Sequence, residues 1–157
     1  MTGDGPLQIS SQAAPDELVA VAEALERISG WTNCATPRGG PRGVALSVLT
    51  TIASAGPLRI SDLAGRERIS QPGMTHVVDR LVEAGLAERR TDRADGRIVL
   101  VAATPAGREH LAAQRSSRVD ALVARLSLLP PRDRHALCAS IDVLNDLSTS
   151  PTPEEAP

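Results

Sequence analysis

Two groups of polar side chains in the middle of the chain have the residue types that bind nucleic acid. The first group follows a predicted helix start and comprises Ser70, Gln71, Thr75, His76 and Arg80. The second surrounds a predicted turn and comprises Arg93, Asp95 and Arg97. Hydroxyl, amide, imidazole and guanidinium groups donate hydrogen bonds to phosphate oxygens and to base edges. Both groups are therefore candidates for contact with a nucleic acid.

The elements that would position these groups can be predicted from residues 57–105. A short helix pattern is followed by a polar turn, a second amphipathic helix, a strand over 86–91, a charged turn and a return strand over 97–103. Ser70 is a predicted N-cap and Pro72 falls in the first helical turn, where its missing N–H costs nothing. Gly85 suits the end of this helix. This order of elements predicts a winged helix-turn-helix, which places one helix in a DNA major groove.

The apolar spacing predicts further helices on both sides of this unit. One covers 16 to about 33, another about 43–54, and a short one is predicted to be capped by Ser61. Thr104-Pro105 opens a long helix that Pro130-Pro131 ends. One last helix is predicted to carry Leu137, Ile141, Leu144 and Leu147. The predicted fold class is mainly α (α+β), a winged helix-turn-helix with a helical dimerisation region formed by N- and C-terminal helices.

These patterns divide the chain into five predicted segments. They are a disordered tail over 1–15, a dimerisation helix over 16–35, the DNA-binding domain over 42–103, dimerisation helices over 104–148 and a disordered tail over 149–157. The terminal helices carry apolar stripes too large to bury inside one small winged domain, which favours a homodimer. An intramolecular helical cap is the alternative.

Composition limits the mode of binding. Trp31 is the single aromatic residue, so the core must be aliphatic, and base stacking on aromatic side chains is disfavoured. All 17 basic residues are Arg, and the formal net charge is −2. From Arg38 to Arg97, ten Arg oppose seven acidic residues, a net of +3; the remainder carries seven Arg against twelve acids, a net of −5. A basic middle between acidic flanks fits a DNA-facing patch.

Other classes of function lack their motifs in this sequence. Gly-rich phosphate loops, nucleophile elbows and paired catalytic carboxylates are missing, so we expect neither an enzyme nor a cofactor. Cys34 and Cys138 have no metal-ligand spacing, and we expect no metal site. The N-terminus lacks a signal pattern and no apolar run is long enough to span a membrane, so we expect a cytoplasmic protein that does not bind membranes.

The residues from about Asp16 to Leu147 resemble the MarR family of bacterial transcriptional regulators. The resemblance rests on six motifs: Ile60-Ser61-Asp62-Leu63-Ala64, Gln71-Pro72-Gly73-Met74-Thr75, the run Val78 to Leu86, Arg89-Arg90, Asp95-Gly96-Arg97, and Thr104-Pro105-Ala106-Gly107. It implies a homodimer that binds a pseudo-palindromic double-stranded DNA operator. It also implies a repressor that a small-molecule effector releases from DNA.

The resemblance assigns roles to individual residues. The recognition helix would contact DNA through Ser70, Gln71, Pro72, Gly73, Thr75, His76 and Arg80, and the wing through Arg93, Asp95 and Arg97. In the family pattern, Asp95 pairs with Arg97 and orients it. Asp79, Glu83 and Glu88 oppose phosphate binding; we expect Asp79 to pair with Arg80 and aim its guanidinium. The alternative for the recognition helix is an ordinary solvated helix face. The alternative for the wing is a charged hairpin turn that does not contact DNA.

Three further residues are weaker candidates. Trp31 could stack on a planar effector, or it could anchor a core or an interface. Cys34 and Cys138 could sense an oxidant, or they could be inert packing thiols. A winged-helix module that binds protein instead of DNA remains the alternative function for the whole chain.

Overall fold

The structure is a computed structural model, and it describes residues 15–35, 40–92 and 95–149. The chain forms two units, Met1–Thr36 and Pro37–Pro157. The first unit contains helix α1, Pro15–Ala35, which has Asp16 and Glu17 in its first turn. Acidic side chains at this end stabilise a helix by favourable interaction with its dipole.

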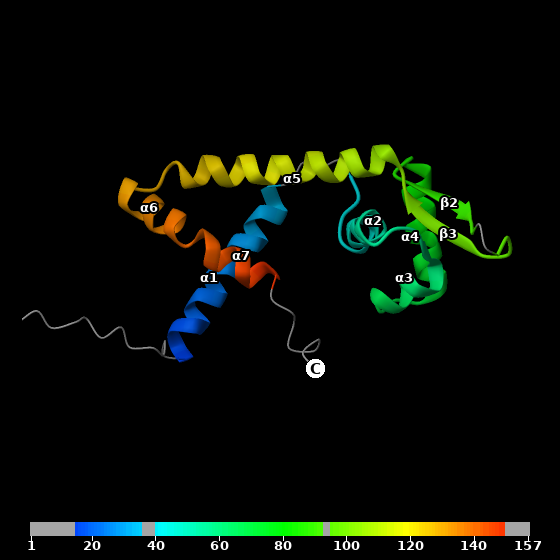
Figure 1. The fold of residues 1–157 in the computed structure, drawn as a ribbon, viewed down its shortest axis with the longest axis horizontal. Coiled ribbons are helices and arrows are strands. Elements are labelled where there is room, and N and C mark those ends of the chain that lie inside the picture. The colour runs from blue at the N-terminus through cyan, green and yellow to red at the C-terminus, as the bar shows by residue number, and fades with distance from the viewer. Residues whose placement is uncertain (1–14, 36–39, 93–94, 150–157) are drawn as a thin grey trace, which may run out of the picture. The chain divides into compact units, whose positions relative to one another are not determined.

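The second unit is a helical domain with one small sheet (Figure 1). Its elements, in chain order, are α2 Val44–Ser54, β1 Leu58–Arg59, α3 Ile60–Arg66, α4 Gln71–Glu83, β2 Ala87–Thr91, β3 Val99–Ala103, α5 Pro105–Leu126, α6 Pro131–Ala139 and α7 Ile141–Thr149. This arrangement confirms the predicted mainly α fold class with a winged helix-turn-helix.

An aliphatic core holds α2, α3, α4 and the sheet together. Its largest fully buried side chains are Val48, Leu49, Ile52, Leu63, Met74, Val78, Leu81 and Val101. Burying one such side chain stabilises a fold by roughly 1.5–3 kcal/mol. Residues of α2 and α4 supply six of these eight side chains, so the two helices pack against each other and the sheet through their apolar faces.

The wing is an antiparallel hairpin that a third, short strand extends. The strand order is β1-β3-β2. Ala87 pairs with Ala103 at the base of the hairpin, and Thr91 pairs with Val99 toward its tip. On the other edge of β3, Arg59 pairs with Leu100. This pairing brings the start of α3 beside the wing.

The predicted N-cap of α3 was wrong. The helix begins at Ile60 with Arg59 as its N-cap residue, and no side chain caps it. The Ser61 hydroxyl instead donates to Asp62 Oδ1 at 3.3 Å. The reason is β1, which the sequence did not predict: its pairing with β3 delivers extended backbone directly to Ile60.

The prediction of one last helix was also wrong, because the chain leaves helical geometry at Ser140 between α6 and α7. The Ser140 hydroxyl donates to the carbonyl of Ala136 at 3.0 Å, and its N–H donates to the carbonyl of Leu137 at 3.1 Å. A serine hydroxyl that bonds back to the preceding turn offers the backbone an alternative to the helical ladder.

Several predictions concern parts of the chain outside the described residues. They are the two predicted tails, apart from Pro15 and Thr149, which are helical, and the wing residue Arg93. Cys34 lies within α1, but its side chain is also outside the described part.

One tight junction joins the recognition helix, the wing and α5. Gly85 ends α4 with a φ of 70°, a left-handed conformation that favours glycine. The Thr104 hydroxyl donates to the Gly85 carbonyl at 2.7 Å and accepts the Gly107 N–H at 3.0 Å, which caps α5. The Thr104 N–H donates to the Leu86 carbonyl at 3.1 Å. A Cβ on Gly107 would lie 2.1 Å from that same carbonyl oxygen.

We expect Gly107→Ala to destabilise the domain, because the added methyl group meets backbone that cannot move aside as a side chain can. Overpacking of this kind costs roughly 1–3 kcal/mol in the free energy of unfolding. The matched control is Gly65→Ala in α3, where an added Cβ has nothing within 4 Å. Removing a helical glycine there should stabilise the protein by up to about 1 kcal/mol. Urea denaturation measures both, and equal effects would contradict the packing argument.

Candidate nucleic-acid interface

The exposed start of α4 carries most of the predicted recognition residues. Ser70 is the N-cap, and its Oγ accepts the Gly73 N–H at 3.3 Å, as the sequence predicted. Since Oγ acts here as the acceptor, the hydroxyl hydrogen can still donate to a ligand. Gln71, Pro72 and Gly73 are exposed around it. The first turn of a helix also presents N–H groups that favour an anion.

Thr75 and His76 follow one turn later on α4. His76 is exposed, whereas Thr75 is half-buried. The Thr75 hydroxyl donates to the Gln71 carbonyl at 2.9 Å. Thr75 therefore must break this local bond before it can donate to a phosphate or a base. His76 is the more accessible donor of the two.

The predicted pairing of Asp79 with Arg80 was wrong. Asp79 Oδ1 instead accepts a hydrogen bond from Arg89 Nη2 of β2 at 2.7 Å. The reason is the packing of α4 against the hairpin, which brings β2 closer to Asp79 than its chain neighbour's guanidinium. Glu88 likewise forms an ion pair with Arg90. Two of the three acids that would oppose phosphate binding are thus neutralised by arginines of the wing.

The tip of the wing is organised by Asp92 and Asp95. The Asp92 N–H donates to the Ile98 carbonyl at 2.9 Å, and the Ile98 N–H donates to the Asp95 carbonyl at 3.0 Å. Asp95 Oδ1 accepts the backbone N–H of Arg97 at 3.0 Å. Asp95 therefore contacts Arg97 through the backbone, and the exposed guanidinium extends from a turn that this bond shapes.

A shallow groove brings the two predicted surfaces together. It has a volume of about 320 Å³ and is lined by Arg59, Ile60, Ser61, Gln71, Arg97, Ile98 and Val99. Gln71 comes from the start of the recognition helix and Arg97 from the wing. All the polar side chains in the lining can donate hydrogen bonds, and none is acidic. A groove with this chemistry suits a phosphate group.

Sequence reasoning missed Arg59 and Ser61 as members of this groove. They reach it because β1 pairs with β3, with Arg59 opposite Leu100. A two-residue strand has no periodicity to detect. The basic residue between two apolar ones, just before the predicted helix, was the only available signal.

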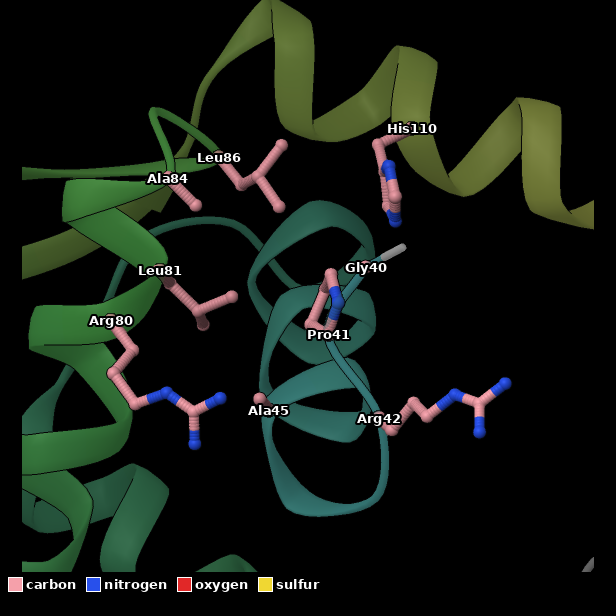
Figure 2. Close-up of a pocket in the computed structure, with 9 residues that line it drawn as sticks. All are labelled: Gly40, Pro41, Arg42, Ala45, Arg80, Leu81, Ala84, Leu86 and His110. Carbon is pink, nitrogen blue, oxygen red and sulfur yellow. The ribbon is translucent and has the colours of Figure 1, made fainter. Parts of the chain in front are cut away.

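Arg80 belongs to a different place from the other predicted residues. It lines a second hollow together with residues of α2, α5 and the segment before α2 (Figure 2). Its guanidinium points toward α2 near Ala45. The groove and this hollow therefore lie at opposite ends of the recognition helix.

Two further candidates lie on α1 and α6. Trp31 is half-buried in α1, within the separate N-terminal unit. Cys138 is an exposed free thiol on α6. Among the described residues, no group of three or more His, Cys, Asp and Glu side chains could hold a metal ion. None of the helices in those same ranges is long and apolar enough to cross a membrane.

Comparison with known proteins agrees with this geometry. The family model described as the MarR family matches residues 44–99. An uncharacterized HTH-type transcriptional regulator of Mycobacterium bovis is 37% identical over 121 residues, which cover 77% of this chain and 85% of that protein. The chain belongs to the MarR family. It is a transcriptional regulator of the DNA-binding, winged-helix type.

Solved structures of other regulators share the fold. The transcriptional regulator Tm0710 of Thermotoga maritima superposes with a TM-score of 0.69 at 19% identity, covering 82% of this chain and 94% of its own. Bordetella bronchiseptica BpsR, whose DNA binding is regulated by 6-hydroxynicotinic acid, superposes with a TM-score of 0.51 at 23% identity and covers 94% of this chain and all of its own. At these identities the likeness concerns the fold.

In this MarR-family chain, we expect the Asp79–Arg89 ion pair to couple the recognition helix to the wing. Both side chains are about 40% exposed, so the coupling should be about 0.2–1 kcal/mol. In a double-mutant cycle of Asp79→Asn and Arg89→Gln, the loss of stability in the double variant should be smaller than the sum of the single losses. Glu83→Gln combined with Arg89→Gln is the control and should be additive. Additivity in both cycles would show that the ion pair contributes nothing.

Proposed function

We propose that this MarR-family regulator is a homodimeric repressor that binds a pseudo-palindromic operator in double-stranded DNA. The recognition helix α4 would enter the major groove, and the wing would reach the adjacent minor groove. The observation that carries this proposal is the groove between them, whose polar lining residues are all hydrogen-bond donors. An operator is chromosomal, so the proposed place of action is the cytoplasm.

The start of α4 would make the contacts to DNA. Ser70 and Gln71 would donate to a phosphate at the helix N-terminus, and Gly73 leaves room for close approach of the backbone. His76 would donate to a base edge in the major groove, with Thr75 beside it. Pro72 would fill the space between these side chains and the DNA. Asp95 would shape the turn from which Arg93 and Arg97 enter the minor groove, where an arginine gains from the negative potential.

The groove gives this proposal a quantitative test. We expect Arg97→Ala and Arg59→Gln each to weaken binding to all DNA sequences, because each removes a phosphate contact. Each should reduce the slope of log K against log salt concentration by about one unit. Fluorescence anisotropy with labelled duplex DNA at four salt concentrations measures the slope. Arg132→Gln is the control, since that exposed arginine lies on α6. An unchanged slope in Arg59→Gln would exclude the groove from the interface.

The homodimer is supported by apolar side chains that the described structure leaves uncovered. In the segment after the wing they are Val119, Val123, Leu126, Leu128, Leu137, Ile141, Val143, Leu144 and Leu147, and on α1 they are Leu18, Val19, Val21 and Ile28. An apolar surface of this extent marks an interaction site in a monomer. A second copy of the chain would cover it and would fix the spacing of two recognition helices.

A pair of neighbouring substitutions on α7 tests the dimer. We expect Leu144→Asp to shift the mass in sedimentation equilibrium from dimer toward monomer, because a charge would be buried in the apolar contact. Asn145→Asp adds the same charge at the next position and should remain dimeric. A monomeric mass for the unmodified protein would instead favour an intramolecular helical cap.

Release by a small molecule completes the proposal. The fold is shared with BpsR, whose DNA binding a small aromatic acid regulates. The hollow beside α2, α4 and α5 offers a place for such a molecule in this chain.

The first experiment is a mobility shift with promoter DNA and competitor DNA at two salt concentrations. Saturable binding of one dimer per site would support the proposal that the protein binds an operator. A lack of specific binding would favour a module that binds another protein.

A further inference from the structure

Helices α3 and α4 end with the same backbone geometry but with different residues at the position that geometry restricts most. At the end of α4, the Gly85 N–H donates to the Val82 carbonyl at 2.9 Å, and the Leu86 N–H donates to the Leu81 carbonyl at 2.9 Å. Gly85 adopts a left-handed conformation, with a φ of 70°. Helices that end with this pair of bonds place one residue in the left-handed region, and that residue is usually glycine. Helix α4 therefore follows the common pattern.

At the end of α3, Arg68 takes the position that Gly85 has in α4. The Arg68 N–H donates to the Gly65 carbonyl at 3.3 Å, and the Ile69 N–H donates to the Ala64 carbonyl at 3.1 Å. Arg68 has a φ of 53°, and among the described residues it is the one non-glycine residue with a positive φ. A β-carbon in this conformation crowds the backbone carbonyl oxygen that follows it. The turn therefore has a cost in stability that glycine would avoid.

Packing inside the domain gives no reason for an arginine at this position. The Arg68 side chain is exposed. Within residues 15–35, 40–92 and 95–149, its guanidinium makes no hydrogen bond and no ion pair. The carboxylate next to it in the chain, Glu67, instead accepts a hydrogen bond from the Ser47 hydroxyl of α2 at 2.6 Å. Unfavourable backbone conformations are concentrated at functional sites, so a role for the free guanidinium is the explanation to test.

The position of Arg68 in the fold indicates what its guanidinium would contact. Arg68 lies two residues before Ser70, the N-cap of α4, so the two Cα atoms are at most about 7 Å apart. Ile69, between them, packs against the core and anchors the turn. Ser70 and Gln71 are exposed, and the first turn of a helix favours an anion. A guanidinium on this turn can therefore reach a phosphate that lies beside the start of α4, and phosphate oxygens match its paired donors.

We propose that Arg68 binds a phosphate of the DNA backbone beside the start of the recognition helix. The left-handed turn carries an arginine because this contact adds affinity for DNA at a cost in stability. This assignment deepens the proposed function and rests on it. The contact lies outside the groove that Arg59 and Arg97 line, so it is an additional phosphate contact. It positions α4 in the major groove and carries no base sequence information.

One substitution should change stability and DNA binding in opposite directions. Arg68→Gly removes the guanidinium and the crowded β-carbon together. In urea denaturation at a fixed protein concentration, the equilibrium constant for unfolding should fall by about two- to fivefold. At about 0.15 M salt, affinity for labelled duplex DNA should fall about fivefold, and the slope of log K against log salt concentration should become shallower by about one unit. A merely structural residue would leave the slope unchanged.

Three further variants separate the charge from the backbone conformation. Arg68→Lys keeps the charge in the left-handed turn and should keep the slope of the unmodified protein. Arg68→Asn removes the charge and introduces a residue that tolerates left-handed backbone, so it should lose the same unit of slope as Arg68→Gly. Arg132→Gln removes an equal charge from α6 and should change neither the affinity nor the slope.

Fluorescence anisotropy on two duplexes, one of promoter DNA and one of mixed sequence, decides the assignment. Equal weakening on both duplexes is expected, because every sequence has the same phosphates. Weakening on the promoter alone would indicate a base contact and would overturn the assignment. Unchanged affinity of Arg68→Gly, its lower stability, or a slope for Arg68→Lys equal to that of Arg68→Gly would each overturn it as well. An unmodified protein that binds neither duplex would overturn the proposed function, and the role of Arg68 with it.

Discussion

The junction where α4, β2, β3 and α5 meet is the constraint on which the rest of this structure depends. Gly85 turns the chain out of the recognition helix, and the Thr104 hydroxyl links that turn to the first turn of α5. Gly107 is in such close contact with the Leu86 carbonyl oxygen that no side chain fits between them. Helix α5, which leads to the proposed dimer surface, is thereby joined to the recognition helix through hydrogen-bonded backbone. A movement of one element must be accommodated by the other.

Electrostatic pairing within the domain resolves the conflict between an acidic chain and a DNA-binding role. The formal net charge is −2. Arg89 and Arg90 neutralise Asp79 and Glu88, which lie on or next to the recognition helix and the wing. These pairs are partly exposed and stabilise the fold little. Their larger effect is on the local potential, because neither of these two carboxylates is left unpaired near the groove that we propose binds DNA.

Periodicity and capping chemistry were enough to predict the fold, and contacts between distant residues were not. The buried face of α4, its Ser70 cap and its end at Gly85 are local features, and each was predicted from residues within one or two turns. Arg59 joins the groove through pairing with Leu100, some forty positions away, which no local pattern reveals. The same holds for Asp79, whose partner is on another element rather than the next residue. Side-chain roles at an interface depend on such tertiary contacts.

The recognition helix borders a different hollow at each of its two ends. Its first residue, Gln71, borders the groove beside the wing, and Arg80 and Ala84 border the hollow beside α2 and α5. A helix of 13 residues spans about 20 Å and behaves as a rigid rod on this scale. A ligand that fixes one end of the rod therefore restricts where the other end can lie. Arg80 and Gln71 are thus joined by one helix, so a change in the position of one is transmitted to the other.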